Sequence, residues 1–132
     1  MLDQEQLEII KKNITDFIEK KNLDVGILME INAEGIKVIE IFGDPFARPD
    51  LKIGTLLNDP GHLYQNEFQL SKEAGNLSNI PTMGMGADCG IRIKSTKYLI
   101  TFDDVLGDMD MDEESIEELT SLQKKLEDSI HE

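Results

Sequence analysis

The sequence VGILMEINAEGIKVIEIFG, residues 25–43, holds two apolar segments separated by a short polar stretch. In the first segment, every second residue from Val25 to Ile31 is apolar, which is the periodicity of a β-strand. The Asn-Ala-Glu-Gly stretch that follows suits a type I turn closed by Gly35 at positive φ. The second segment, 36–42, is rich in β-branched residues, which favour strands. Residues 25–43 therefore predict a β-hairpin.

A helix is predicted before this hairpin, over about residues 3–21. Asp3 is a good N-cap, and Gln6 stands three residues later, as in a capping box. Asn22 can adopt the left-handed conformation that ends many helices. Apolar residues at helical spacing form one stripe along this segment; they are Leu7, Ile10, Ile14, Phe17 and Ile18.

A second hairpin and a last helix are predicted in the final third of the chain. The strands of this hairpin cover residues 90–94 and 97–102. Asp112 caps the last helix, and its apolar stripe is Ile116, Leu119, Leu122, Leu126 and Ile130. The expected fold is therefore α+β. An antiparallel β-sheet built from two hairpins is flanked by N-terminal and C-terminal α-helices, in a single domain covering residues 1–132.

The middle of the chain is less regular, and all four prolines fall there. We expect a short strand within 51–57. Residues 62–74 fit both a helix and a strand, and we favour the helix. Residues 75–90 are rich in Gly, Asn, Ser, Met and Pro, which predicts a long, partly ordered loop. Loops of this length inside a compact domain are uncommon and often functional.

The composition excludes several kinds of site and location. The single cysteine, Cys89, rules out an internal disulfide and a cysteine-based zinc site. No apolar run approaches the roughly 18 residues that a membrane helix needs, and the first residues do not resemble a signal peptide. We expect a cytoplasmic protein with no metal and no cofactor.

Negative charge is concentrated at the carboxyl end. The segment from Asp103 to Glu132 contains twelve acidic residues against Lys124 and Lys125, and so holds most of the net charge of −14. Such a field repels nucleic acid and anionic lipid, and it favours a basic protein partner. The residues expected to contact this partner are Asp103, Asp104, Asp108, Met109, Asp110, Met111, Asp112, Glu113 and Glu114.

The first hypothesis for function follows from this charge and from the absence of a catalytic constellation. It is a small protein-binding module, immunity-, chaperone- or adaptor-like, and not an enzyme. The order of its elements, with an acidic loop before the terminal helix, is similar to that of roadblock-type domains and type III secretion chaperones. Exposed strand edges of the hairpins also favour a symmetric homodimer.

The alternative hypothesis is a small enzyme or ligand-binding domain that uses the 75–90 loop. Cys89, Asp88 and His62 are its candidate site residues, and the hypothesis requires them to line one concave pocket. The structural interpretation of Cys89 is a small buried residue at the start of a strand. An acidic run from Asp108 resembles the start of a calcium loop, but Leu119 stands where a bidentate Glu is needed, so we expect no calcium site.

Overall fold

The computed structural model describes residues 3–49, 51–58, 77–81, 87–93, 97–104 and 113–129. As expected, one described helix precedes the strands along the chain and another follows them. In chain order the elements are α1 (Gln4–Lys21), β1 (Val25–Asn32), β2 (Gly35–Gly43), the 3-10 turn η1 (Pro45–Ala47), β3 (Leu56–Leu57), β4 (Leu77–Pro81), β5 (Ala87–Arg92), β6 (Tyr98–Asp104) and α3 (Glu113–Ser129).

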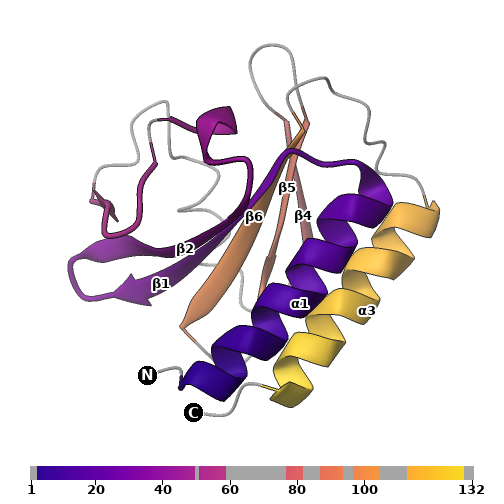
Figure 1. Ribbon diagram of the computed structural model, residues 1–132, viewed down its shortest axis with the longest axis horizontal. Coiled ribbons are helices and arrows are strands. Elements are labelled where there is room, and N and C mark those ends of the chain that lie inside the picture. Colours follow the sequence, from indigo (N-terminus) through magenta and orange to yellow (C-terminus); the bar gives the residue numbers. More distant parts are fainter. Residues whose placement is uncertain are drawn as a thin grey trace.

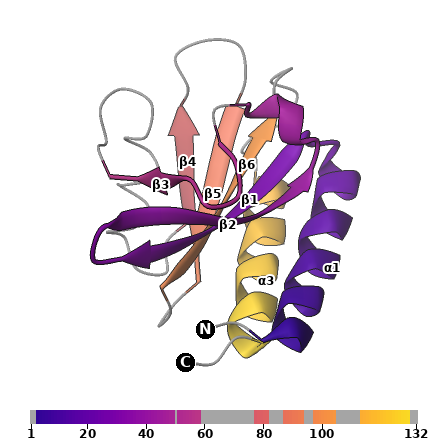
Figure 2. The same cartoon turned by 60° about the vertical axis from the view of Figure 1, so that its left-hand side comes forward.

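The strands form one antiparallel sheet in the order β3-β2-β1-β6-β5-β4. The two central strands, β1 and β6, pair from Val25 opposite Asp103 to Glu30 opposite Tyr98. The helices α1 and α3 lie side by side and run in opposite directions on one face of the sheet (Figure 1). The segment with η1 and β3 lies on the other side of β1 and β2 (Figure 2). Among the described residues, helices cover one face of the sheet and none covers the other, so the two are called here the helix-covered face and the helix-free face.

The helix-covered face is closed by apolar packing. Phe17 of α1 contacts Phe102 of β6, with 5.1 Å between ring centroids. Gly26 of β1 lets α1 approach closely, because a Cβ built there would meet Ile14 Cγ2 at 2.9 Å. The buried residues of this core are Ile10, Ile14, Phe17, Ile18, Leu23, Leu28, Phe42, Ile93, Tyr98, Ile100, Phe102, Leu119, Leu122 and Leu126.

The helix-free face carries a second apolar cluster, centred on β1 and β2. Val25, Ile27 and Met29 of β1 alternate with the residues that face the helices, as strand geometry requires. Leu51 and Leu57 pack over them from the segment after β2. The cluster is completed by Ile36, Val38 and Leu99. Its residues come from β1, β2, the central strand β6 and the segment after β2.

The α+β prediction is confirmed, and so are the capping signals of the first helix. Asp3 Oδ1 accepts a hydrogen bond from the Gln6 backbone N–H at 2.8 Å, and Gln6 Oε1 accepts one from the Asp3 N–H at 3.1 Å. Asn22 has φ 54°. In the turn of the first hairpin, Asn32 Oδ1 accepts hydrogen bonds from the N–H groups of Glu34 and Gly35.

Two expectations for the middle of the chain need correction. The strand expected within 51–57 is confined to β3, whose two residues pair with Ile36 and Lys37. The loop expected over 75–90 contains all of β4 and the first four of the six residues of β5. Pairing with β6 supplies the long-range hydrogen bonds that local composition did not indicate. The helix favoured over 62–74 lies outside the described residues.

No helix in the described part of the chain is long and apolar enough to cross a bilayer.

Candidate functional site

Strand register places a group of polar residues on the helix-free face. Residues paired directly across antiparallel strands share a face of the sheet. On β6, Leu99, Thr101 and Asp103 alternate with the three residues buried under the helices. Their partners on β5 are Arg92, Gly90 and Asp88, and the partners of Gly90 and Asp88 on β4 are Ser78 and Ile80. One half of this face is therefore apolar and the other half is largely polar.

Thr101 lies at the boundary between these halves. It pairs with Ile27 of β1 on one side and with Gly90 of β5 on the other. Its residue surface is only 2% exposed, and among the described residues its Oγ1 has no hydrogen-bond partner. A buried hydroxyl without a partner is costly. Among the described residues, the Thr101 hydroxyl is therefore a buried polar group whose hydrogen-bond partner is not identified.

The two carboxylate-bearing positions nearest Thr101 face each other across the strands. Asp103 stands two residues beyond Thr101 on β6 and pairs directly with Asp88 of β5. Gly90, between Asp88 and the far end of β5, leaves the central position without a side chain. These four positions form the candidate site: Thr101, Asp103, Asp88 and Gly90.

The described residues place only part of the backbone of the residue triad in the alternative hypothesis. Cys89 pairs with Phe102, whose side chain packs under the helices, whereas Asp88 pairs with Asp103 on the opposite face. Asp88 and Cys89 hold consecutive positions on β5, which in a regular strand belong to opposite faces of the sheet, and the grouping of the triad stays a prediction. His62 lies outside the described residues. Of the three, only Asp88 belongs to the candidate site.

The acidic residues of the first hypothesis are divided by the fold. Asp103 and Asp104 end β6 at consecutive positions and so occupy opposite faces; Asp104 pairs with Ala87. Glu113 and Glu114 begin α3, and Glu114 is exposed. The remaining expected partner contacts, Asp108, Met109, Asp110, Met111 and Asp112, lie outside the described residues. Within the part of the chain that the structure describes, no cluster of three or more acidic, His or Cys residues is arranged to hold a metal ion.

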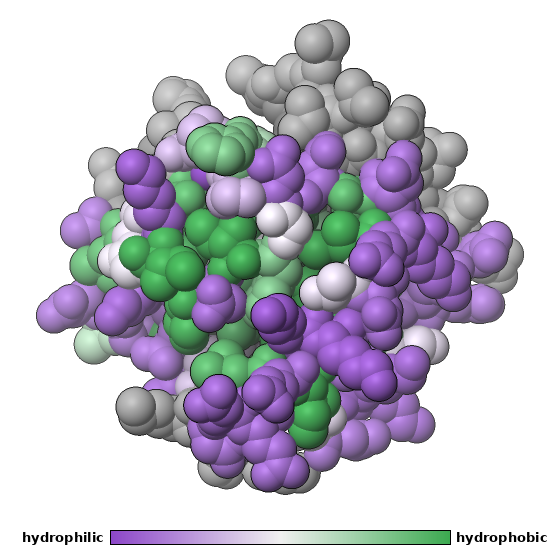
Figure 3. All heavy atoms as spheres, viewed as in Figure 1, coloured by the Kyte–Doolittle hydropathy of each residue, from purple (hydrophilic) through white to green (hydrophobic). Residues whose placement is uncertain are grey.

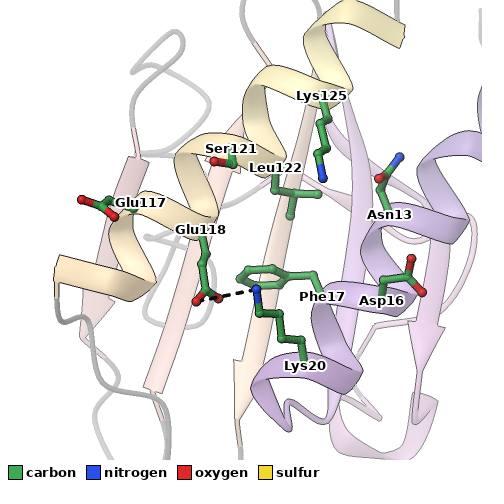
Figure 4. A pocket seen from close by; sticks show the side chains of 9 residues that line it. All are labelled: Asn13, Asp16, Phe17, Lys20, Glu117, Glu118, Ser121, Leu122 and Lys125. Atoms are coloured by element: carbon green, nitrogen blue, oxygen red, sulfur yellow. Dashed lines mark ion pairs between the residues drawn. The ribbon is translucent and has the colours of Figure 1, made fainter.

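A groove of about 430 Å³ separates α1 from α3 on the helix side of the molecule. Phe17 and Leu122 form its apolar base, while Lys20 and Glu118 face each other at one end (Figure 4). Glu118 lies 3.9 Å from Lys20 Nζ and 2.9 Å from Lys21 Nζ, measured to its carboxylate oxygens. Because Lys20 and Lys21 already pair with Glu118, the groove is better explained as part of the contact between α1 and α3 than as a ligand site.

Apolar residues are also exposed beside β2. Hydrophilic residues cover the outward faces of α1 and α3, whereas apolar residues gather over β1, β2 and the segment after β2 (Figure 3). Phe46 is 84% exposed and Ile53 is 62% exposed in this segment. Single exposed apolar residues are common on protein surfaces, and these two carry no site.

No family model and no curated protein sequence matches the chain. Solved structures do match it in shape. The GAF domain of a two-component sensor histidine kinase from Bacillus halodurans has a TM-score of 0.66 at 15% identity, over 98% of this chain and 95% of that one. The chain has the GAF fold. The red/green cyanobacteriochrome NpR6012g4, in its red light-absorbing state, has a TM-score of 0.64 at 14% identity over 96% of both chains.

The same GAF architecture extends to a protein of another kind. The reduced form of fRMsr from Staphylococcus aureus has a TM-score of 0.59 at 10% identity, covering 92% of this chain and 81% of that one. At such identities the likeness establishes the fold and leaves the residues of each site to be argued separately.

The GAF fold corrects the first hypothesis for function. An immunity-, chaperone- or adaptor-like module was wrong, because the matching structures include GAF domains of two sensor histidine kinases and of a phosphoenolpyruvate-protein phosphotransferase, and a cyanobacteriochrome. The acidic run misled because charge density describes solubility and association, not the fold. In the described part of this run, Glu114, Glu117 and Asp128 are exposed residues of α3, as on an ordinary solvated helix.

Sequence reasoning also missed Thr101 and its neighbours as a site. Within Tyr98–Asp104 the residues before Asp103 are apolar except for Thr101. A lone polar residue at the centre of an apolar strand was the available signal, since a central strand is buried on both faces. The pairing of Asp103 with Asp88 could not be found in the same way, because the register joins residues fifteen positions apart.

Proposed function

We propose that this chain is a small-molecule-binding, sensory domain whose ligand lies on the helix-free face over β4, β5 and β6. The GAF fold supports the proposal, since matching structures include domains of sensor histidine kinases and a light-absorbing cyanobacteriochrome. The observation that carries it is Thr101, whose Oγ1 is buried without a partner among the described residues. A ligand atom in hydrogen-bond range of Oγ1 removes that cost.

Three further parts of the proposal come from the sequence. The domain binds its ligand without catalysing a reaction. It acts in the cytoplasm, where a single reduced cysteine is ordinary. The symmetric dimer expected from the strand edges stays a prediction, to be measured by light scattering.

The proposal is tested first by what the protein retains on purification. Native mass spectrometry of the protein from its own host, compared with a denatured sample, detects a small molecule that leaves on unfolding. We expect one such species in wild type. In Thr101→Val we expect the dissociation constant to rise about fivefold and the occupancy to fall with it, since one hydrogen bond contributes about 1 kcal/mol.

Thr15→Val is the matched control for this measurement. Thr15 lies on α1 and is only partly buried, so the same loss of a hydroxyl occurs away from the helix-free face. Equal occupancy in wild type, Thr101→Val and Thr15→Val contradicts the placement of the ligand. A protein that retains nothing, and that no compound of a metabolite library stabilises against heat, contradicts small-molecule binding itself.

A further inference from the structure

Part of the outer edge of β2 is left without a described strand beside it. The outer neighbour of β2 is β3, which pairs with only two of its residues. The segment before β3 covers one more, because Val38 N–H donates to Thr55 O and Val38 O accepts from Gly54 N–H, both at 2.8 Å. Among the described residues, no hydrogen bond reaches the outer edge of β2 beyond Val38. The rest of the strand, Ile39 to Gly43, is called here the β2 edge.

The backbone groups of Ile41 point out of the β2 edge. On β1, Ile31 N–H donates to Lys97 O, so every second residue of β1, including Ile27, directs its backbone groups toward β6. Ile41 pairs with Ile27 and therefore belongs to a pair that exchanges no hydrogen bonds. Its N–H and C=O face away from β1. Such exposed backbone groups are a template for pairing with another chain.

A groove of about 420 Å³ lies between the β2 edge and the first half of α1. Leu7 and Ile41 are partly buried apolar residues of its lining. Glu8 and Lys11 of α1 and Glu40 of β2 also line it. In the described part of the chain, no ion pair involves these three charged side chains, whereas the lysines beside the other groove pair with a glutamate. The charges of this groove are therefore available to a partner.

A second copy of the chain fits the β2 edge poorly. To exchange hydrogen bonds in an antiparallel pair, Ile41 of one copy must stand opposite Ile41 or Gly43 of the other. In either register Glu40 lies opposite or diagonal to Asp44 of the second copy, and like charges at these positions are unfavourable. Two chains of net charge −14 also repel each other. The occupant is therefore a different chain.

Charge selects a basic occupant. Glu8 and Glu40 outnumber Lys11 in the groove, and the net charge of the whole chain has the same sign. A strand added beside Ile41 directs alternate side chains to opposite faces of the sheet. Those that share the face of Glu40 lie over the groove and next to α1. Basic side chains at these positions complement Glu8 and Glu40, while the backbone of the added strand pairs with Ile41.

We propose that the β2 edge binds an extended, basic segment of another protein, which adds a strand beside Ile41 and places Lys or Arg side chains over Glu8 and Glu40. This surface lies at the opposite end of the sheet from the ligand proposed over β4, β5 and β6. It is also separate from the acidic segment at the carboxyl end. The proposal goes beyond the proposed function and does not rest on it.

The probe is the peptide acetyl-Val-Lys-Val-Lys-Val-amide, titrated into the whole chain while backbone amide shifts are followed by NMR. When it is extended, its lysines share one side and its valines the other. We expect the largest shifts at Ile41 and Gly43. Binding should be about tenfold tighter than that of acetyl-Val-Glu-Val-Glu-Val-amide, and salt should reduce this preference. Equal affinity of the two peptides overturns the proposal.

Methylation of one peptide nitrogen separates strand addition from general attraction of charge. In the proposed pose the backbone groups of the valines face Ile41, and those of the lysines face away from β2. N-methylation of the central valine should therefore raise the dissociation constant more than about tenfold. N-methylation of one lysine is the matched control and should change it by less than about twofold. Equal losses for the two methylated peptides overturn strand addition.

Variants of the protein locate the peptide. Ile41→Pro removes an N–H that does not pair with β1, and it should abolish binding, whereas Ile41→Val keeps the N–H and should bind as wild type does. Glu40→Gln and Glu8→Gln should each weaken binding about threefold, and they keep the test open if the proline variant fails to fold. Glu19→Gln, exposed near the other end of α1, is their control. An equal loss in Glu19→Gln overturns the proposal.

The remaining outcomes also decide the question. Shifts confined to α3 or β5 place the peptide elsewhere and overturn the proposal. Absence of binding by the lysine peptide overturns it as well. If light scattering then shows a dimer that Ile41→Pro dissociates, the β2 edge binds a second copy. Each of these results leaves the retained small molecule untouched, so the proposed function fails or holds on its own test.

Discussion

The two faces of the sheet differ in the side chains that they carry and in what covers them. On the helix-covered face, Leu28 of β1 and Tyr98, Ile100 and Phe102 of β6 are buried apolar residues, and Gly26 allows α1 to pack directly on the strand. On the helix-free face, the same strands carry Ile27 and Thr101 side by side, and the polar positions of β5 follow. Both faces thus carry apolar clusters, but the helix-free face also holds a buried hydroxyl that has no partner among the described residues.

The largest loss of stability is expected when a buried side chain of the helix-covered face is truncated. Phe102→Ala removes a fully buried ring that packs on Phe17, and it should lower the free energy of unfolding by about 3–5 kcal/mol. Phe46→Ala is the matched control, because that ring is mostly exposed; it should change stability by less than about 0.5 kcal/mol. Denaturation with urea measures both, and similar losses contradict the assignment of the core.

Adding a methyl group to the packed core of the same face should lower the free energy of unfolding by a smaller amount. Gly26→Ala places a methyl group against Ile14 Cγ2 and Phe102 Cε1, at 2.9 and 3.1 Å. We expect a loss of about 1–3 kcal/mol. Ile14→Leu removes the Cγ2 methyl, so the double variant should lose less than the sum of the two single variants. Additive losses in this cycle show that the two groups do not clash.

The helix-free face should respond in the opposite direction. Thr101→Val replaces a buried, unpartnered hydroxyl by a methyl group of similar size, and should raise the free energy of unfolding of the ligand-free protein by about 1 kcal/mol. Thr15→Val should stay within about 0.5 kcal/mol of wild type. A loss of stability in Thr101→Val means that the hydroxyl already has a structural partner, and removes the main support for the site.

The smallest change in stability is expected at the ion pairs between α1 and α3. Glu118→Gln removes the negative partner of Lys20 and Lys21, and should cost about 0.5–1 kcal/mol. Glu117→Gln, on an exposed neighbour, should cost less. The difference between the two variants should shrink in 1 M sodium chloride, as measured by thermal unfolding. A difference that salt leaves unchanged points to packing instead of charge.

Most of the fold was predictable because its signals are local. The capping pair Asp3 and Gln6, the left-handed Asn22 and the turn closed by Gly35 each lie within a few residues of the element they define. β4 and the start of β5 were missed because Leu77–Pro81 and Ala87–Arg92 contain Ser, Asn, Gly and Pro, which seldom favour strands. Their pairing partners stabilise them from a distance.

The candidate site was less predictable for the same reason. Asp88 was considered beside Cys89 because the two are neighbours in sequence, yet neighbours on a strand occupy opposite faces. Asp103 was considered with the acidic run that follows it, although its partner in the sheet is Asp88. Strand register decides which polar residues meet, and one sequence alone does not specify it.

Thr101 and Phe102 are joined by a single peptide bond, with one residue on each side of the sheet. Their Cα atoms are held about 3.8 Å apart. The ring of Phe102 lies 5.1 Å from that of Phe17 in α1, between centroids. The backbone of β6 thus directly connects the unpartnered hydroxyl on one face of the sheet to the helix packing on the other.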